Sequence, residues 1–111
     1  NNSANRIERY VSFTPTLNTY YHIAVTYDGS ETPSGMKLYI NSIASGSARA
    51  IGTTYLGLST SIDNVIIGKF PTITTYTLNG KIDETAIYNT ALTQTEIDLL
   101  YNSGNGITLW N

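Results

Sequence analysis

Apolar and polar residues alternate along several stretches of the chain, and a period of two residues is the pattern of a β-strand. Residues 6–14 alternate in this way and end at Pro15. Residues 20–27 are apolar on both faces, which is typical of a strand in the middle of a sheet. Residues 36–41 alternate again, so we expect them to return antiparallel to 20–27 as a hairpin. The residues of that returning strand that we expect to point inward are Met36, Leu38 and Ile40.

Shorter apolar runs predict three further strands, at 43–48, 64–68 and 81–88. Asn41 and Ser42 form the turn before the first of them. Because Ser tolerates a left-handed backbone poorly, we expect this turn to be loose or of another type than the tight Asn-Gly turn.

A single helix is predicted after these strands. Thr93 and Glu96 have the spacing of a capping box, in which each side chain bonds the backbone N–H of the other. Leu92 and Ile97 stand where a hydrophobic staple requires them, and Gly104 is the expected stop. The sequence therefore predicts one short helix near the end of a chain that is otherwise patterned as strands.

Three blocks of sequence occur in a fixed order: residues 21–29 with 37–41, then 66–68, then 80–104. The last block contains Gly-x-Ile-Asp-Glu, Ile-Tyr and Asn-x-Ala-Leu, followed by a helix that runs into Leu-Tyr-Asn-x-Gly. Together the blocks resemble the C-terminal part of laminin-G-like domains of the concanavalin A-like lectin/glucanase superfamily. The resemblance implies an all-β fold, namely an antiparallel β-sandwich of the jelly-roll type, with one short C-terminal helix.

The length of 111 residues suits one small domain. The resemblance covers nearly the whole chain but only the later part of the family pattern, and the family's opening strands have no counterpart. We therefore expect residues 1–111 to be a partial laminin-G-like domain. Strands left without neighbours would expose sheet edges and apolar surface, so we expect an upstream segment or another chain to complete the sheets.

The composition of the chain argues against several classes of partner and site. The net charge is −2 and the six basic residues are scattered, which argues against nucleic acid as a partner. No apolar run approaches the roughly 18 residues of a membrane span, so we expect no membrane insertion. The chain has no Cys, which excludes disulfides and thiolate metal sites. Neutral polar residues and Tyr are abundant, and we associate such surfaces with an extracellular, cell-surface or virion-surface location.

Enzymatic activity is not expected. His22 is the one histidine, it falls inside a predicted strand, and no Gly-x-Ser-x-Gly elbow is present. Asp83 and Glu84 are adjacent, so on a strand they point to opposite faces and cannot act together on one sugar. We expect His22 to be a hydrogen-bonded sheet residue and the two acids to accept hydrogen bonds from loop backbone.

The sequence leaves two kinds of ligand open. Many laminin-G-like domains bind calcium near loops at one edge of the sandwich, and calcium requires six to eight oxygen ligands. The candidate ligands are Asp28, Asp63, Asn64 and Asp83. A glycan would need flat aromatic rings with nearby amides or carboxylates in loops, and the candidates are Tyr55 and Tyr76 with Asn79 or Asp63.

Two functions follow from this reading. The first is a non-catalytic recognition module that binds a glycan or a surface protein and serves adhesion. The alternative is a structural or assembly domain of a virion fibre, a decoration protein or a cell-surface appendage. An assembly domain would bury a large surface against other chains or domains, whereas a recognition module would present a concave patch with exposed aromatic and amide groups.

Overall fold

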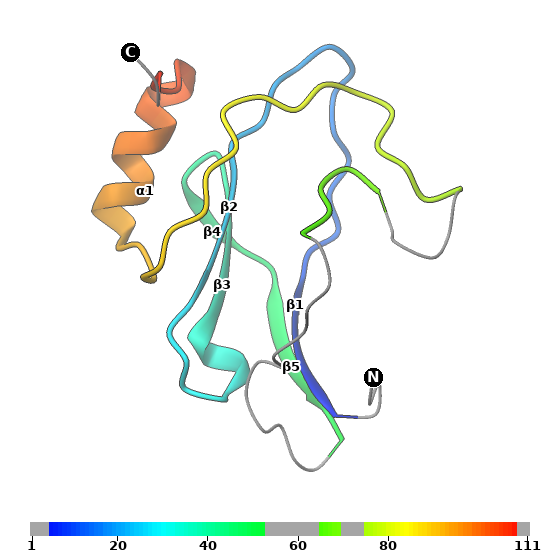
Figure 1. The fold of residues 1–111 in the computed structure, drawn as a ribbon, viewed down its shortest axis with the longest axis vertical. Helices are drawn as coiled ribbons and strands as arrows, with labels where there is room; N and C mark the ends of the chain where they lie inside the picture. The colour runs from blue at the N-terminus through cyan, green and yellow to red at the C-terminus, as the bar shows by residue number, and fades with distance from the viewer. Residues whose placement is uncertain (1–4, 53–64, 70–74, 109–111) are drawn as a thin grey trace. The chain divides into compact units, whose positions relative to one another are not determined.

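A computed structural model describes residues 5–52, 65–69 and 75–108 of the chain. The chain divides into two units. Unit 1 comprises Asn1–Gly57 and Tyr88–Asn111, and unit 2 comprises Leu58–Ile87. The named strands and the α-helix of the described residues all belong to unit 1 (Figure 1).

The first sheet of unit 1 has three antiparallel strands in the order β2–β3–β4. Their bounds are β2 Ile23–Tyr27, β3 Met36–Ile40 and β4 Ile43–Ser45. A short 3-10 helix, η1 (Pro33–Gly35), lies in the loop that joins β2 to β3. Ile23 pairs with Ile40 in the β2–β3 ladder, which confirms the predicted hairpin.

The turn between β3 and β4 is tighter than the sequence suggested. Asn41 and Ser42 have φ values of 50° and 68°, and positive φ at both central residues is the feature of a type I′ hairpin turn. The Asn41 Oδ1 atom accepts the backbone N–H of His22 at 3.0 Å, which fixes the first turn residue. The expectation of a loose turn was therefore wrong, and the left-handed Ser42 is held by contacts with the helix that are described below.

The second sheet pairs β1 (Arg6–Tyr10) with β5 (Ser47–Ile51) in antiparallel register. Gly46 separates β4 from β5 and has a φ of +80°. A Cβ atom on Gly46 would lie 2.4 Å from the carbonyl oxygen of Tyr10, so a side chain does not fit here. Glycine at this position lets the chain leave the first sheet after β4 and enter the second sheet as β5. The strand predicted at 43–48 is therefore two strands, and the second extends beyond residue 48 to Ile51.

The helix α1 (Gln94–Tyr101) confirms the predicted cap. Thr93 is the N-cap, and both hydrogen bonds of the capping box with Glu96 are present. The helix ends earlier than expected, because Asn102 adopts a left-handed conformation with a φ of 47° and acts as the C-cap. Gly104 instead closes a 3-10 turn, η2 (Asn102–Gly104), that follows directly.

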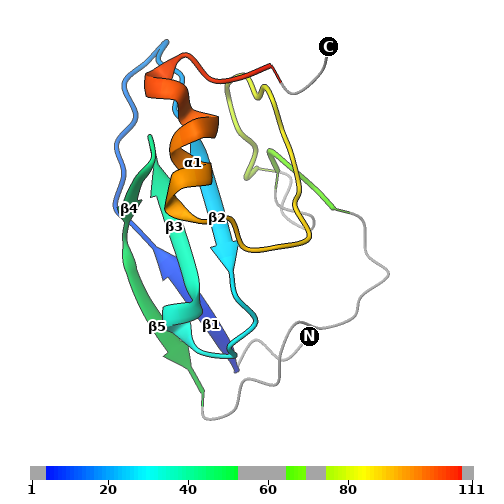
Figure 2. The ribbon, with the colours of Figure 1, turned by 90° about the vertical axis from the view of Figure 1, so that its left-hand side faces the viewer.

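Few apolar side chains are buried among the described residues. Ile97 of α1 is 0% exposed, Tyr39 of β3 is 3% exposed, and Ile7 of β1 is 8% exposed. Figure 2 shows α1 lying in front of β2 and β3. Leu38 and Ile40 were predicted to point inward, but both are half-buried. The deepest burial in β3 is on its other face, at Tyr39. Alternation defines two faces of a strand, and the elements that pack against the sheet decide which one is covered.

The described part of unit 2 forms less regular structure than predicted. Lys69 and Thr77 form an isolated antiparallel bridge, and the Leu78 N–H donates to the Gly68 carbonyl oxygen at 2.7 Å. Neither residues 65–68 nor residues 81–88 form a strand, and the two predictions of strands there were wrong for the described residues. A strand is stabilised by a neighbour that pairs its N–H and C=O groups, and the described residues supply no ladder for either segment.

The described residues therefore form antiparallel sheets with one short α-helix, as the predicted fold class requires. The closed two-sheet sandwich stays a prediction. No helix among the described residues has the length and the apolar character needed to cross a membrane.

Candidate functional site

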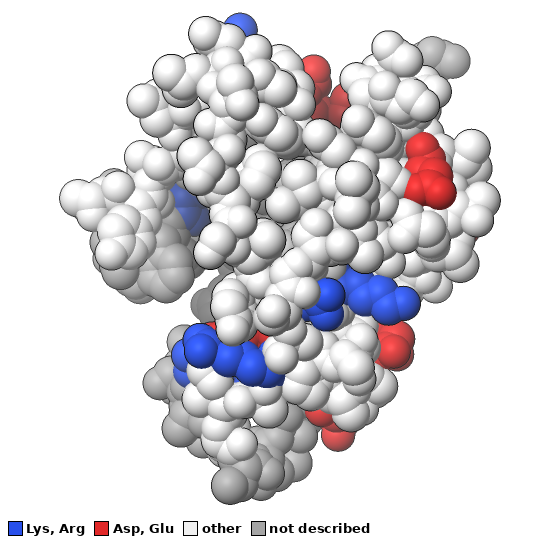
Figure 3. Space-filling view, turned by 180° about the vertical axis from the view of Figure 1, so that it is seen from behind, with Lys and Arg blue, Asp and Glu red and all other residues white. Residues whose placement is uncertain are grey.

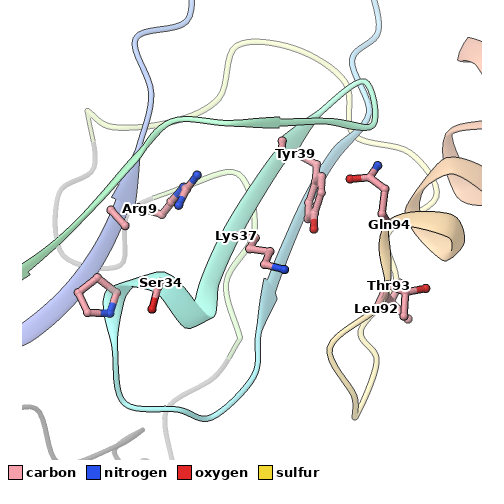
Figure 4. Close-up of a pocket in the computed structure, with 10 residues that line it drawn as sticks. Arg9, Ser34, Lys37, Tyr39, Leu92, Thr93 and Gln94 are labelled. Carbon is pink, nitrogen blue, oxygen red and sulfur yellow. The ribbon is translucent and has the colours of Figure 1, made fainter.

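A groove of about 690 Å³ lies on the surface of unit 1. It is formed by β1, β3, the β4–β5 segment, η1 and the start of α1 (Figure 4). The described residues that line it are Arg9, Pro33, Ser34, Lys37, Tyr39, Ala44, Ala48, Leu92, Thr93 and Gln94.

Strand register explains why these residues meet. Arg9 is opposite Ala48 in the β1–β5 ladder, and Tyr39 is opposite Ala44 in the β3–β4 ladder. Directly opposed residues in an antiparallel ladder point to the same face, so each large side chain has a small neighbour beside it. The two alanines leave the space that becomes the groove. Figure 4 shows Lys37 and Tyr39 projecting from β3, between Arg9 on one side and Gln94 on the other.

A hydrogen-bond cluster at the β3–β4 turn holds the helical wall of the groove in place. The Gln94 Nε2 atom donates to the Ser42 carbonyl oxygen at 2.8 Å and to the Asp98 Oδ1 atom at 2.7 Å. The Ser42 hydroxyl also donates to the Asp98 carboxylate, and these bonds from Ser42 and Gln94 lower the pKa of Asp98. The cluster joins residues more than fifty positions apart in sequence and thereby positions Gln94 at the rim of the groove.

The four basic residues of unit 1 fall into two pairs with different surroundings. Arg6 and Arg49 bind the carboxylate of Glu8, with the Arg49 Nη2 atom 2.7 Å from Glu8 Oε2. The Arg6 hydrogen bond, followed by that of Arg49, lowers the pKa of Glu8. Arg9 instead donates from Nε to the Ser45 carbonyl oxygen at 3.1 Å. Lys37 forms no ion pair with any described residue.

Figure 3 shows one face of the molecule on which Lys and Arg side chains gather in two groups in its lower half. Most of the remaining surface in that view carries neither basic nor acidic side chains, in keeping with the sparse charge of the sequence. Other basic side chains are visible apart from these two groups, and acidic side chains lie next to the basic ones in the same view.

The two predicted glycan-binding residues that the structure describes, Tyr76 and Asn79, are not among the described residues that line this groove. Tyr76 and Asn79 lie exposed in unit 2, and Tyr76 is 65% exposed. Tyr55 and Asp63 lie outside the described residues. Sequence reasoning missed the groove residues, although one signal was present: Arg9 is a cation on the same face of its strand as the apolar Ile7.

Two of the four predicted calcium ligands, Asp28 and Asp83, are among the described residues, and each accepts a hydrogen bond from nearby backbone. The Asp28 Oδ1 atom accepts the Ser30 N–H at 2.9 Å, and hydrogen bonds from Ser30 are the main reason that the pKa of Asp28 is lowered. The Asp83 Oδ1 atom accepts the Glu84 N–H at 3.0 Å, as expected for an acid that binds loop backbone. Asp63 and Asn64 lie outside the described residues, among which no three His, Cys, Asp or Glu side chains cluster as metal ligands would. A calcium site stays a prediction.

His22 differs from the hydrogen-bonded sheet residue that was predicted. It directly precedes β2, and its ring lies 6.0 Å from the Tyr101 ring, measured between centroids. The Nδ1 atom is buried and has no hydrogen-bond partner among the described residues. Burial lowers the pKa of His22 and so favours the neutral ring. A Ser-His-Asp device requires a carboxylate bonded to one ring nitrogen, and Nδ1 has no such partner in the described part of the chain.

Comparison with known proteins identifies the family. The model of the concanavalin A-like lectin/glucanases superfamily, in its laminin-G form, matches residues 1–98. No curated protein and no solved structure gave a match. The match covers most of the chain and agrees with the antiparallel sheets and the short helix described above. The chain therefore belongs to the concanavalin A-like lectin/glucanase superfamily as a laminin-G-like domain.

Proposed function

We propose that this domain is a non-catalytic recognition module that binds a glycan in the groove of unit 1. The observation that carries the proposal is the lining of the groove, which combines polar side chains with apolar ones. Members of the superfamily often bind carbohydrate or other ligands, which supports the proposal at the level of class.

The chemistry of the lining suits a saccharide. A sugar presents hydroxyl groups along its edges and C–H groups on its faces, so it is held by polar groups placed around an apolar surface. The hydroxyl of Tyr39 has no hydrogen-bond partner among the described residues, and Tyr39 lines the groove although the residue as a whole is 3% exposed. Ala44 of β4 and Ala48 of β5 add apolar surface to the lining.

The same lining argues against hydrolysis. Glycosidases commonly place two carboxyl groups on either side of the bond to be cleaved. None of the described residues that line the groove is an Asp or a Glu. We therefore propose that the domain binds its ligand without cleaving it. We also propose an extracellular, cell-surface or virion-surface location.

Glycan-array binding by a multivalent display of the domain tests the proposal. A shallow site gives weak binding, with dissociation constants from roughly millimolar to high micromolar, so several copies must act together. Tyr39→Phe keeps the buried ring and removes the hydroxyl, and we expect it to weaken binding about fivefold. Tyr20→Phe is the matched control, because Tyr20 is 66% exposed and does not line the groove. Equal binding by the two variants would place the site elsewhere.

One observation favours the alternative function, an assembly domain. Ile23, Val25 and Ile43 are 53%, 61% and 70% exposed, and the ladder register places them on one face of the β2–β3–β4 sheet. Monomeric proteins rarely expose large continuous apolar patches, so this face suits burial against other chains or domains of a larger assembly. A recombinant domain that stays monomeric and does not bind a hydrophobic dye would count against this second function.

A further inference from the structure

The hydrogen bonds at the two ends of β2 show which of its residues bond to β3. Before the strand, the Asn41 N–H donates to the His22 carbonyl oxygen at 2.9 Å. After it, the Asp28 N–H donates to the Gly35 carbonyl oxygen at 3.2 Å. Both pairs continue the register of the β2–β3 ladder. Because hydrogen-bonded and non-bonded pairs alternate in an antiparallel ladder, residues 22, 24, 26 and 28 direct their backbone groups toward β3.

The remaining residues of β2 face an open edge. The backbone N–H and C=O groups of Ile23, Val25 and Tyr27 point away from β3, and β2 has no second neighbouring strand among the described residues. No other backbone hydrogen bond of the described residues reaches these groups. The side chains of Ile23 and Val25 are 53% and 61% exposed on one face of the same strand. β2 therefore presents free backbone groups and exposed apolar side chains together.

The edge of β2 lacks the features that usually prevent edge strands from pairing with other chains. Those features include charged residues, Pro, bulges and short length. Among the other edge strands of the described residues, β1 carries three charged residues and β5 carries Arg49. β4 is three residues long and stops at the bend at Gly46. β2 reads Ile-Ala-Val-Thr-Tyr, without charge, Pro or Gly, so its edge is the one in this group that is open to pairing.

We propose that two copies of the domain pair through β2 in antiparallel register, with Val25 on the two-fold axis. Ile23 then lies opposite Tyr27 of the second copy, and Val25 lies opposite Val25 of the second copy. All of these residues direct their backbone groups outward, so each pair exchanges both of its N–H···O=C hydrogen bonds. The two three-stranded sheets become one continuous sheet.

The side chains favour a second copy as the occupant of this edge. A two-fold axis brings the same surface of both copies together, so the strand must match itself. In the proposed register a β-branched residue lies beside an aromatic one at the Ile23–Tyr27 pairs, which is a favourable cross-strand pair. No like charges meet, because β2 carries none. This inference goes beyond glycan binding and does not depend on it.

Sedimentation equilibrium of the full chain over a range of concentrations tests the pairing. One strand pair is a small interface, so we expect a weak dimer with a dissociation constant of roughly tens to hundreds of micromolar. Val25→Lys places two ammonium groups at the axis and should weaken the dimer at least about tenfold. Ile43→Lys is the matched control. Ile43 is 70% exposed on the same face and gains the same charge, but it belongs to β4, at the other side of the sheet.

Amide hydrogen exchange tests the register in the unsubstituted chain. In dilute protein, the amides of Ile23, Val25 and Tyr27 should exchange faster than those of Ala24 and Thr26, which bond to β3. At a concentration where most of the chain is dimeric, the three outward amides should exchange about fivefold more slowly than in dilute protein.

Each possible outcome decides a separate point. A chain that stays monomeric up to millimolar concentration, or a dimer that Val25→Lys leaves unchanged, would overturn the inference. A dimer that Ile43→Lys weakens as much as Val25→Lys would be joined through the apolar face, which overturns edge pairing and leaves the assembly function standing. A dimer without slower exchange at the three outward amides would refute the register. A chain that binds no glycan would count against the proposed glycan binding alone.

Discussion

Truncation of Ile97 is the most direct test of how unit 1 is held together. Ile97 is 0% exposed, and the other buried apolar side chains among the described residues are Tyr39 and Ile7. Ile97→Ala removes three carbon atoms from a fully enclosed position. Such substitutions cost about 2–5 kcal/mol, through the lost transfer of apolar surface from water and the cavity that remains.

The lower half of this range, about 2–3 kcal/mol, is the expected value here. The core around Ile97 contains few other buried side chains, so its neighbours can collapse into the space more readily than in a large core. A domain of this size has a total stability of roughly 5–15 kcal/mol, so the loss would be a large fraction of it. The predicted effect is therefore measurable by urea unfolding followed by circular dichroism.

The matched control lies on the same helix. Leu99 is 66% exposed, and Leu99→Ala should change the free energy of unfolding by no more than about 0.5 kcal/mol. Ile97→Val, which removes one methyl group, should cost about 0.5–1.5 kcal/mol and fall between the two. If Ile97→Ala were no more destabilising than Leu99→Ala, α1 would not pack as described, and the helical wall of the groove would have no structural basis.

Three further predictions concern stability. Thr93→Ala removes the acceptor of the capping box and should cost about 1 kcal/mol in thermal unfolding, whereas an unchanged transition would contradict the assigned helix start. Gly46→Ala should lower the free energy of unfolding by about 2 kcal/mol or more, because the residue has a φ of +80° and the new Cβ would meet the Tyr10 carbonyl oxygen. If the variant were as stable as the wild type, the backbone between β4 and β5 would differ from the one described. The Thr93 hydrogen bonds lower the folded-state pKa of Glu96 from 4.5, so its contribution is present above about pH 4.5 and is lost as the pH falls through the lowered value. Glu96→Gln should reduce this acid dependence in unfolding curves measured from neutral to low pH, and an unchanged dependence would refute the assignment.

Local sequence determined the elements whose stabilising contacts are themselves local. The capping box joins Thr93 to a residue three positions away, so the spacing alone predicted the helix start. The β2–β3 hairpin was predicted because its two strands are joined by a short loop and each alternates with a period of two residues. The sequence also predicted the family, because the resemblance rests on the order of three sequence blocks. The superfamily match to residues 1–98 confirms this prediction.

Tertiary structure decided which faces are covered and which side chains meet. Alternation marks two faces on β3, but only the packing of other elements against the sheet buries Tyr39 and leaves the opposite face partly open. The strand predicted at 81–88 has suitable residues, yet a strand depends on a paired neighbour that its own sequence cannot supply. The left-handed Ser42 shows the same dependence, because its contacts with Gln94 and Asp98 come from a helix more than fifty residues away.

The groove is the clearest case of this dependence. Arg9 and Lys37 are separated by nearly thirty residues and belong to strands in different sheets, and Gln94 belongs to the helix. In the sequence the basic residues look scattered, which is why no basic site was predicted. The bend at Gly46 carries one chain segment from the ladder of β3 to the ladder of β1, and this brings the two cations to one surface. Their proximity is a property of the strand order and register, which sequence spacing does not encode.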